Sequence, residues 1–292
     1  MSSPPVLLLC RLFPGTFTDV AHRFRLLDFY ASALPIRAFL AAVAAHADPP
    51  RVVLVFGGGP IPVGADLLDA VPSLRCIITV SAGTNHIDLR ECARRGVQVA
   101  NAAGIYSTDV ADYAVGLLLD VLRHVSAGDR FVRRGLCPEQ RGGDFLPLGS
   151  KIGGKRAWAP YKFYPSVREL AAESDVLVLS CALTEETRRM VDREVMEALG
   201  KGGVLVNVGR GGLVDEAELV RCLREGVVGG AGLDVYENEP EVPPELWGMD
   251  NVVLSDHRAV ITPESIQGVV DVVKANLDAF FSGKPLVSQV QL

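Results

Sequence analysis

The 292-residue sequence contains no C-x-x-C pair, and none of its apolar runs approaches the roughly 20 residues that a membrane-spanning helix needs. Scattered cysteines without metal-ligand spacing argue against a zinc ribbon or a disulfide framework. We therefore predict no metal site, no membrane partner, reduced thiols and a cytoplasmic location. The six cysteines are Cys10, Cys76, Cys92, Cys137, Cys181 and Cys222.

Positive charge is not in excess either. The chain has 29 Lys and Arg against 35 Asp and Glu, for a formal net charge of -6. Because binding to phosphate backbones depends on a surplus of cations, we expect no nucleic-acid partner. A local basic pocket for a small acid is compatible with this balance. With 49% hydrophobic residues at this length, a packed protein of two domains is the natural expectation.

Short β-rich runs alternate with longer amphipathic segments, which predicts α/β domains with parallel sheets. The nearly continuous apolar character of these runs is typical of strands buried on both faces. The expected strands are Val6–Cys10, Val52–Phe56, Cys76–Val80, Val97–Asn101, Asp175–Cys181, Gly203–Val208, Gly229–Val235 and Asn251–Leu254. The expected helices are Ala38–Ala45, Leu89–Arg95, Ser107–His124, Ser166–Ala172, Glu186–Leu199, Glu216–Glu225 and Pro263–Phe281.

Three titratable or charged side chains follow successive predicted strands. Arg210 comes after GVLVNV, Glu239 after GAGLDV and His257 after NVVLS. Ligands of open α/β sheets bind beyond the carboxyl ends of the strands, so these groups are expected at one edge. Taken singly, each is more often a solvated or salt-bridging residue. The pattern alone leaves catalysis and a structural role about equally favoured.

The three groups suit the reduction of a 2-oxo acid. Arg210 would bind the substrate carboxylate through two charge-assisted contacts. The alkoxide formed from the ketone needs a proton, and His257 is the side chain best able to supply one near neutral pH. Glu239 would hold the imidazole ring and raise its pKa.

The segments NVGRGGLVDEAEL, GAGLDVYENEP and HRAVITPES resemble the signature blocks of the D-isomer-specific 2-hydroxyacid dehydrogenases, in the same order and spacing. Within that family the chain is most similar to plant-type hydroxypyruvate/glyoxylate reductases. The likeness includes SAGTNHIDL and STDVADYAVGLLL in the first half of the chain. It implies reduction of hydroxypyruvate or glyoxylate with NADPH or NADH. The length and apolar character of the helix at 107–124 suit an element that crosses between domains or packs against a second subunit, and we expect a homodimer through it.

The resemblance also implies two doubly wound domains. A flavodoxin-like substrate domain would comprise 1–105 plus 262–292, and a truncated Rossmann domain for NAD(P) would comprise 106–261. Backbone amides at Ala82 and Gly83, together with Arg210, would bind the substrate carboxylate. The cofactor would lie against Thr108, Cys181, Val208 and Asp234. For Cys181 a buried small apolar residue is favoured over a reactive role, Asp234 as a turn cap is an equal alternative, and His86 and His124 are expected to be structural.

The family's G-x-G-x-x-G loop, which holds the cofactor pyrophosphate, is missing. The lead-in LGSKIGGKR ends at Arg156 and is followed directly by AWAPYKFYPSVREL. The nucleotide domain therefore lacks its first strand–helix–strand, roughly 30 residues. The strand DVLVLSC would then have an unpaired apolar edge, which favours aggregation. A catalytically impaired truncated isoform or a pseudoenzyme that acts as a binding or dimerising subunit is thus the alternative to a working reductase.

Two smaller departures from the family pattern concern the site. The residue before the catalytic histidine is commonly proline in the family and is Asp256 here. We expect its charge either to raise the pKa of His257 further or to disturb the loop. Cys137 lies near the place where some reductases present an aromatic residue to the substrate, which leaves the preferred acid open.

Overall fold

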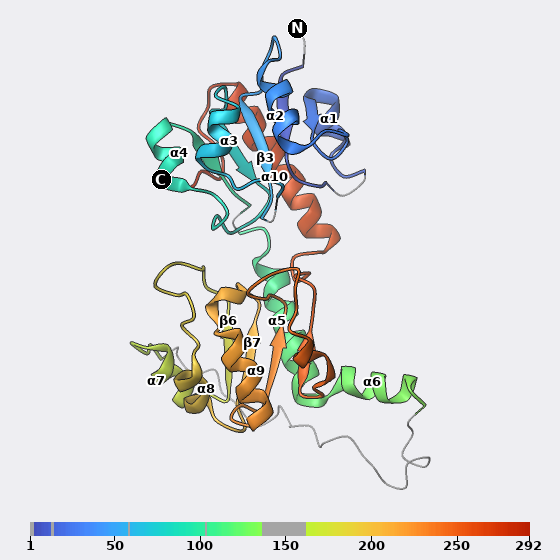
Figure 1. The fold of residues 1–292 in the computed structure, drawn as a ribbon, viewed down its shortest axis with the longest axis vertical. Coiled ribbons are helices and arrows are strands. Elements are labelled where there is room, and N and C mark those ends of the chain that lie inside the picture. The colour runs from blue at the N-terminus through green and yellow to red at the C-terminus, as the bar shows by residue number, and fades with distance from the viewer. Residues whose placement is uncertain (1–2, 13–14, 58, 103, 136–161) are drawn as a thin grey trace. The chain divides into compact units, whose positions relative to one another are not determined.

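A computed structural model describes residues 3–12, 15–57, 59–102, 104–135 and 162–292. The chain divides into two compact units (Figure 1). Unit 1 comprises Met1–Ser107 and Ile261–Leu292, and unit 2 comprises Thr108–Val260. In the part of the chain that is described, no helix combines the length and the apolar character needed to cross a membrane.

Unit 1 is built on a five-stranded parallel sheet with the order β2-β1-β3-β4-β5. This is the flavodoxin-like strand order, so the predicted α/β fold with a flavodoxin-like domain is confirmed. Strands β1, β3 and β4 are buried along their whole length, as their apolar runs predicted. The strands are β1 (Pro5–Leu8), β2 (Arg25–Asp28), β3 (Val52–Val55), β4 (Cys76–Thr79) and β5 (Gln98–Ala100).

Helices lie on both faces of this sheet. Helix α10 packs its buried Val269, Val273 and Leu277 against one face, in a cluster that includes Val6 and Ile78. A second cluster, with Leu40 and Leu67, covers the other face. The helices of unit 1 are α1 (Thr18–Arg23), α2 (Ile36–Ala44), α3 (Ala65–Ala70), α4 (Leu89–Arg95) and α10 (Pro263–Phe281).

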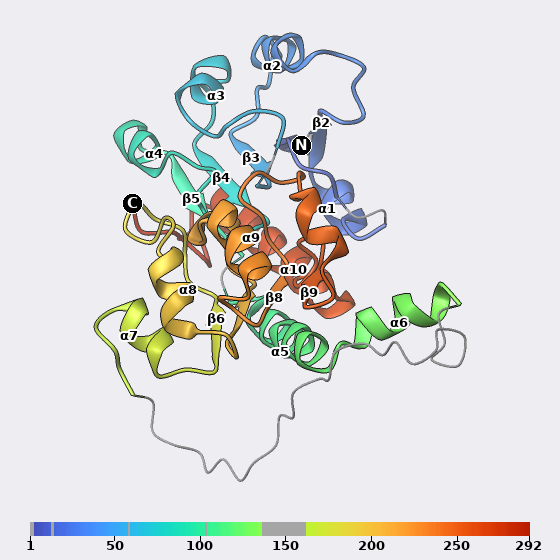
Figure 2. The ribbon, with the colours of Figure 1, turned by 60° about the horizontal axis from the view of Figure 1, so that its bottom comes forward.

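Unit 2 contains a four-stranded parallel sheet with the order β6-β7-β8-β9. Helix α5 covers one face, where its Leu117 and Val121 meet Val206 of β7. Helices α8 and α9 pack on the opposite face, and α6 projects away from the sheet (Figure 2). The strands are β6 (Val176–Leu179), β7 (Val204–Asn207), β8 (Gly230–Leu233) and β9 (Val252–Leu254). The helices are α5 (Ser107–Arg123), α6 (Val125–Arg133), α7 (Val167–Ala172), α8 (Arg193–Leu199) and α9 (Glu216–Glu225), with short 3-10 turns η2 (Gly211–Leu213) and η3 (Pro244–Gly248).

The helix predicted over Glu186–Leu199 is wrong in its first half. Helix α8 begins only at Arg193, because the Asp192 side chain accepts a hydrogen bond from the Val195 amide and so caps the helix there. Before it, Arg189 has a left-handed φ of 50°, which interrupts any helix. The segment is instead a turn stabilised by Thr184 and Thr187.

Strand β6 is an edge of its sheet within the described residues, since it pairs there only with β7. Its Val178 side chain is 45% exposed. The predicted loss of a strand–helix–strand near residue 156 and the role suggested for Cys137 both fall on 136–161, outside the described residues.

Candidate active site

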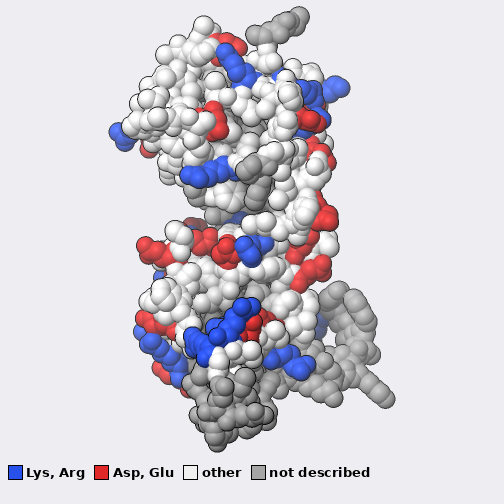
Figure 3. Space-filling view, turned by 90° about the vertical axis from the view of Figure 1, so that its right-hand side faces the viewer, with Lys and Arg blue, Asp and Glu red and all other residues white. Residues whose placement is uncertain are grey.

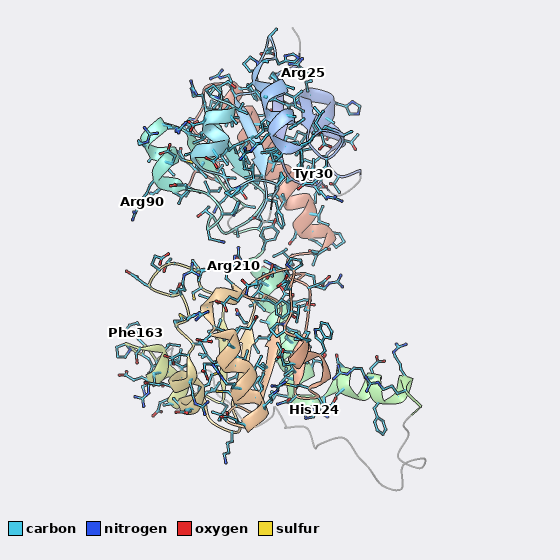
Figure 4. The ribbon with its side chains drawn as sticks, in the orientation of Figure 1. Arg25, Tyr30, Arg90, His124, Phe163 and Arg210 are labelled. Carbon is cyan, nitrogen blue, oxygen red and sulfur yellow. The ribbon has the colours of Figure 1, made fainter. Side chains whose placement is uncertain are left out.

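Three neighbouring strands of unit 2 deliver the residues that the sequence analysis singled out. Arg210 follows β7, Glu239 follows β8 and His257 follows β9, and these strands lie next to one another in the sheet. Figure 4 labels Arg210 at the carboxyl-terminal edge of the sheet, with His124 at the opposite end of the unit. The parallel register therefore brings a cation, a carboxylate and an imidazole to one edge.

Glu239 and His257 are in direct contact. The His257 Nδ1 atom lies 2.8 Å from Glu239 Oε2, and each side chain is 35% exposed. The other carboxylate oxygen, Oε1, accepts a hydrogen bond of 3.1 Å from the Tyr236 amide. The carboxylate is thus fixed by the backbone, and the imidazole ring is fixed by the carboxylate. This leaves Nε2 of His257 as the ring atom directed away from the pair.

The pKa of Glu239 is lowered from its ordinary value. Burial acts to raise this pKa, but the hydrogen bonds from His257 and the Tyr236 amide and the charges of His257 and Arg210 outweigh it. Burial lowers the pKa of the Arg210 guanidinium, and the charge of Glu239 opposes that effect. The two groups are therefore electrostatically coupled, and Glu239 stays ionised in the neutral range.

A close backbone contact holds the loops of Arg210 and Glu239 together. Gly211 packs so tightly that an added Cβ atom would lie 1.8 Å from the Tyr236 carbonyl carbon. Any side chain at this position would push the β7 loop away from the β8 loop. Arg210 is fixed on the other side, where its carbonyl accepts a 3.0 Å hydrogen bond from Asn207 Nδ2. The glycine in NVGRGG thus sets the position of the arginine.

The His257 loop is strained and is held by Asp234. His257 has a φ of 56°, in the left-handed region that non-glycine residues rarely adopt. Its amide donates to the Asp234 carbonyl at 2.8 Å. The Asp234 carboxylate accepts the amides of Arg258 and Ala259 at 3.0 and 3.1 Å. Asp234 therefore organises the turn that presents the imidazole.

The charge of Asp256, beside His257, is paired. Its Oδ1 atom lies 2.6 Å from Nε of Arg258, on the other side of the histidine in sequence. Both side chains are largely exposed, so the pair is weak but local. Because Asp256 and Arg258 carry opposite charges, together they add little net charge next to the imidazole. Asp234 holds the loop, although Asp256 stands where the family commonly has proline.

In unit 1, Ala82 and Gly83 lie in the turn after β4, at the carboxyl edge of that sheet. Neither amide donates a hydrogen bond to another described residue. Behind the turn, Thr79 Oγ1 lies 3.1 Å from His86 Nε2 and accepts the Ser81 amide at 3.2 Å. His86 thus belongs to the packing that supports the turn.

The four residues expected at the cofactor differ in accessibility. Thr108 and Cys181 are exposed, whereas Val208 and Asp234 are 7% and 1% exposed. Both oxygens of the Asp234 carboxylate are bonded within the His257 turn, which favours the alternative that Asp234 caps this turn. The alternative that Cys181 is a buried apolar residue is wrong, since its side chain is exposed. For the pyrophosphate of NAD(P), no strand of unit 2 in the described residues leads into a G-x-G-x-x-G turn. The four cofactor contacts stay predictions.

Sequence reasoning missed two supporting residues, Tyr113 and Ser255. The Tyr113 hydroxyl lies 2.6 Å from Ser255 Oγ, which in turn donates to Asp234 Oδ1 at 2.7 Å. Tyr113 is on α5, more than a hundred residues before the loop, and no local pattern signals the contact. Ser255 offered one signal, its place directly before the Asp-His pair.

On the face in Figure 3, basic and acidic side chains are interspersed in both units. Among the described residues, no group of three or more His, Cys, Asp or Glu is arranged to hold a metal ion.

The chain is similar in sequence and in fold to known proteins. A model of the NAD binding domain of D-isomer specific 2-hydroxyacid dehydrogenases matches residues 150–259. The glyoxylate/hydroxypyruvate reductase HPR3 of Arabidopsis thaliana is 46% identical, over 100% of this chain and 98% of that protein. The hydroxyphenylpyruvate reductase of Plectranthus scutellarioides is 39% identical, over 99% of this chain and 100% of its own length.

A solved structure supports the same likeness. The NADPH-dependent glyoxylate/hydroxypyruvate reductase of Sinorhizobium meliloti, determined with NADP and malonate, is 29% identical and superposes with a TM-score of 0.82. The superposition covers 99% of this chain and 97% of that one.

In the alignment with the Arabidopsis protein, this chain is the shorter of the two. The alignment spans 326 positions and includes all 292 residues of this chain, so about 34 positions have no residue here. That is about the size of the strand–helix–strand that the sequence analysis expects to be missing after Arg156. Its location in the chain stays a prediction.

Proposed function

The chain belongs to the D-isomer specific 2-hydroxyacid dehydrogenase family, and on that premise we propose that it reduces a small 2-oxo acid, hydroxypyruvate or glyoxylate, with NADPH or NADH. The observation that carries the proposal is the 2.8 Å contact between His257 and Glu239, at the sheet edge that also bears Arg210. The names of the relatives support the substrate class.

Each residue has a separate task in this reaction. Arg210, partly desolvated, binds the substrate carboxylate and orients the ketone. Nε2 of His257 holds the proton that the developing alkoxide takes up. Glu239 keeps the imidazole ring oriented. A bound nicotinamide cofactor would supply the hydride.

We further propose that cofactor affinity is reduced. The missing G-x-G-x-x-G loop and the deficit of about 34 aligned positions remove the usual source of amide donors for the pyrophosphate. The same two observations favour the second candidate, a catalytically impaired chain that serves as a binding or dimerising subunit. The two candidates differ in turnover, not in fold.

One experiment separates them. The purified chain is titrated with NADPH and NADH by fluorescence and assayed with hydroxypyruvate and glyoxylate. Turnover that is abolished by Arg210→Ala and by His257→Ala supports the reductase. The matched controls are Arg168→Ala and His22→Ala, both exposed and outside the candidate site. Turnover that survives in the Arg210 and His257 variants contradicts the assigned roles, and no turnover at all supports the impaired subunit.

We propose that the chain forms a homodimer through α5. Val115 and Leu119 lie one turn apart on this helix and are 55% and 45% exposed. Val125 and Val132 on α6 extend the apolar surface. Leu119→Glu should convert the dimer to a monomer in light scattering after size exclusion, whereas Val287→Glu in unit 1 should not. A monomeric wild-type chain would contradict the proposal.

We also propose a cytoplasmic location. All five cysteines among the described residues are free thiols, in keeping with a reducing compartment. Cell fractionation followed by immunodetection of the native chain tests this, and recovery in an organelle fraction would contradict it.

A further inference from the structure

Three consecutive carbonyl groups in the turn after β4 are bound by one neighbouring segment. The Val80 carbonyl accepts from the Tyr106 hydroxyl at 2.5 Å. The Ser81 carbonyl accepts from the Ala102 amide at 3.0 Å. The Ala82 carbonyl accepts from Asn101 Nδ2 at 2.7 Å. The segment after β5 thus holds this turn through hydrogen bonds to three of the turn's carbonyl oxygens.

The orientation of the amides follows from peptide geometry. In a planar trans peptide the C=O and the next N–H point in opposite directions. The bond to the Ser81 carbonyl therefore directs the Ala82 amide away from the 101–106 segment. The bond to the Ala82 carbonyl does the same for the Gly83 amide. Both amides lie in a part-exposed turn and have no acceptor among the described residues.

Among the described residues, one side chain bonds to these two peptides. The Ser81–Ala82 peptide is held by the Ala102 backbone amide, which side-chain substitutions other than proline leave in place. The Ala82–Gly83 peptide is held by the side chain of Asn101. Because this peptide ends at a glycine, it rotates easily once the bond is lost. The direction of the Gly83 amide thus depends on Asn101.

Asn101 is itself anchored by the C-terminal segment. Its carbonyl accepts from Ser288 Oγ at 2.6 Å, and its amide donates to the Ser288 carbonyl at 3.2 Å. Ser288 Oγ is held at 3.0 Å by Nδ2 of Asn276, a residue of α10 with 0% exposure. A buried asparagine on the last helix therefore fixes the asparagine that directs the turn.

We propose that Asn101 is a positioning residue for the substrate: it aims the Gly83 amide at the carboxylate of the 2-oxo acid, and Asn276 and Ser288 hold it in place. This inference rests on the proposed function and on the role that the family resemblance implies for the amides of Ala82 and Gly83, which would bind the substrate carboxylate together with Arg210. Asn101 would then favour substrates that carry a carboxylate, although its side chain does not contact the substrate.

The test compares Asn101→Ala with wild type for hydroxypyruvate reduction. KM should rise roughly tenfold, the effect of weakening one hydrogen bond to a charged group, while kcat and the Kd for NADPH change less than about threefold. The matched control is Asn251→Ala, which removes a 3.1 Å bond from an asparagine side chain to the Gly229 carbonyl in unit 2. Equal KM in wild type and Asn101→Ala, or an equal rise in the control, overturns the inference.

A second readout does not need turnover. Oxamate, an unreactive carboxylate with the shape of the substrate, is titrated while the amide NMR signals of Ala82 and Gly83 are followed. Saturable shifts of both in wild type, with the Gly83 shift weakened in Asn101→Ala, support the inference even in a chain that turns nothing over. Absence of any shift in wild type overturns it. Failure of turnover alone counts only against the proposed reductase.

Discussion

The Tyr113 hydroxyl lies 2.6 Å from Ser255 Oγ, and this contact joins helix α5 to the loop that presents His257. Ser255 Oγ donates to Asp234 Oδ1 at 2.7 Å, so the Tyr113 proton is directed at Ser255. Asp234 in turn holds the amides on the carboxyl side of the histidine. A chain of hydrogen bonds therefore runs from the helix expected at the dimer interface to the strained turn of His257.

Tyr113→Phe is expected to lower kcat for hydroxypyruvate by roughly fivefold, with KM unchanged. The substitution deletes one partly buried hydrogen bond, about 1 kcal/mol, whose loss loosens the His257 turn without touching the carboxylate sites. Steady-state kinetics measures the effect, and Tyr30→Phe in unit 1 is the matched control. A lower melting temperature with unchanged kcat would show that the tyrosine contributes only to stability.

Glu239→Gln is expected to lower kcat for hydroxypyruvate by roughly tenfold. Glu239 Oε2 lies 2.8 Å from Nδ1 of His257 and holds the imidazole ring, so a neutral amide at this position holds the ring less firmly and the proton at Nε2 is less often directed at the ketone. Steady-state kinetics measures the effect. Equal kcat in wild type and variant would contradict the role of Glu239.

The same substitution has a consequence for stability. The folded-state pKa of Glu239 is lower than its ordinary value of about 4.3, so its stabilising effect is present above that pH and is lost as pH falls through the folded pKa. Wild type should therefore lose more stability than Glu239→Gln below about pH 4. Denaturant midpoints at pH 3 to 6 measure the difference, with Glu245→Gln, an exposed carboxylate outside the pair, as control.

The sequence predicted the strands best where both faces are buried. The apolar runs at β3 and β7 located those strands to within a residue or two. The sequence pattern did not predict the strand at Arg25–Asp28. All four residues of β2 are only half-buried, and the pattern RLLD resembles many loops. Helix α9 was predicted with its bounds, since Asp215 caps one end and Gly226 adopts the left-handed conformation at the other.

The site was predictable only in part, for a physical reason. Arg210, Glu239 and His257 follow strands, and parallel pairing obliges strand ends to meet. Tyr113 and Asn101 act through single contacts to loops distant in sequence, and no periodicity encodes such contacts. The tight approach at Gly211 also appears only when the β7 and β8 loops are seen side by side.

Cys181 is expected to be the cysteine that reacts fastest, and NADPH should protect it. It is exposed, whereas burial raises the pKa of the thiols of Cys10 and Cys76 to about 12 and keeps them protonated. In a Cys137→Ser background, NADPH at about ten times its Kd should slow alkylation of Cys181 by roughly tenfold, because only the unliganded fraction reacts. Peptide mapping measures the rate. If NADPH binds but does not slow the alkylation of Cys181, the cofactor does not lie against this residue.

Val178→Thr is expected to reduce aggregation while leaving turnover unchanged. The side chain is 45% exposed on β6, which pairs on one side only within the described residues, and an apolar edge invites pairing with another chain. Threonine retains the strand preference of valine, so unfolding free energy should change by no more than about 0.5 kcal/mol. Light scattering during refolding at rising protein concentration measures the effect, with Val287→Thr, exposed outside any strand, as control. Equal scattering from Val178→Thr and wild type would mean that the β6 edge is already covered, by another part of the chain or by a second copy of it.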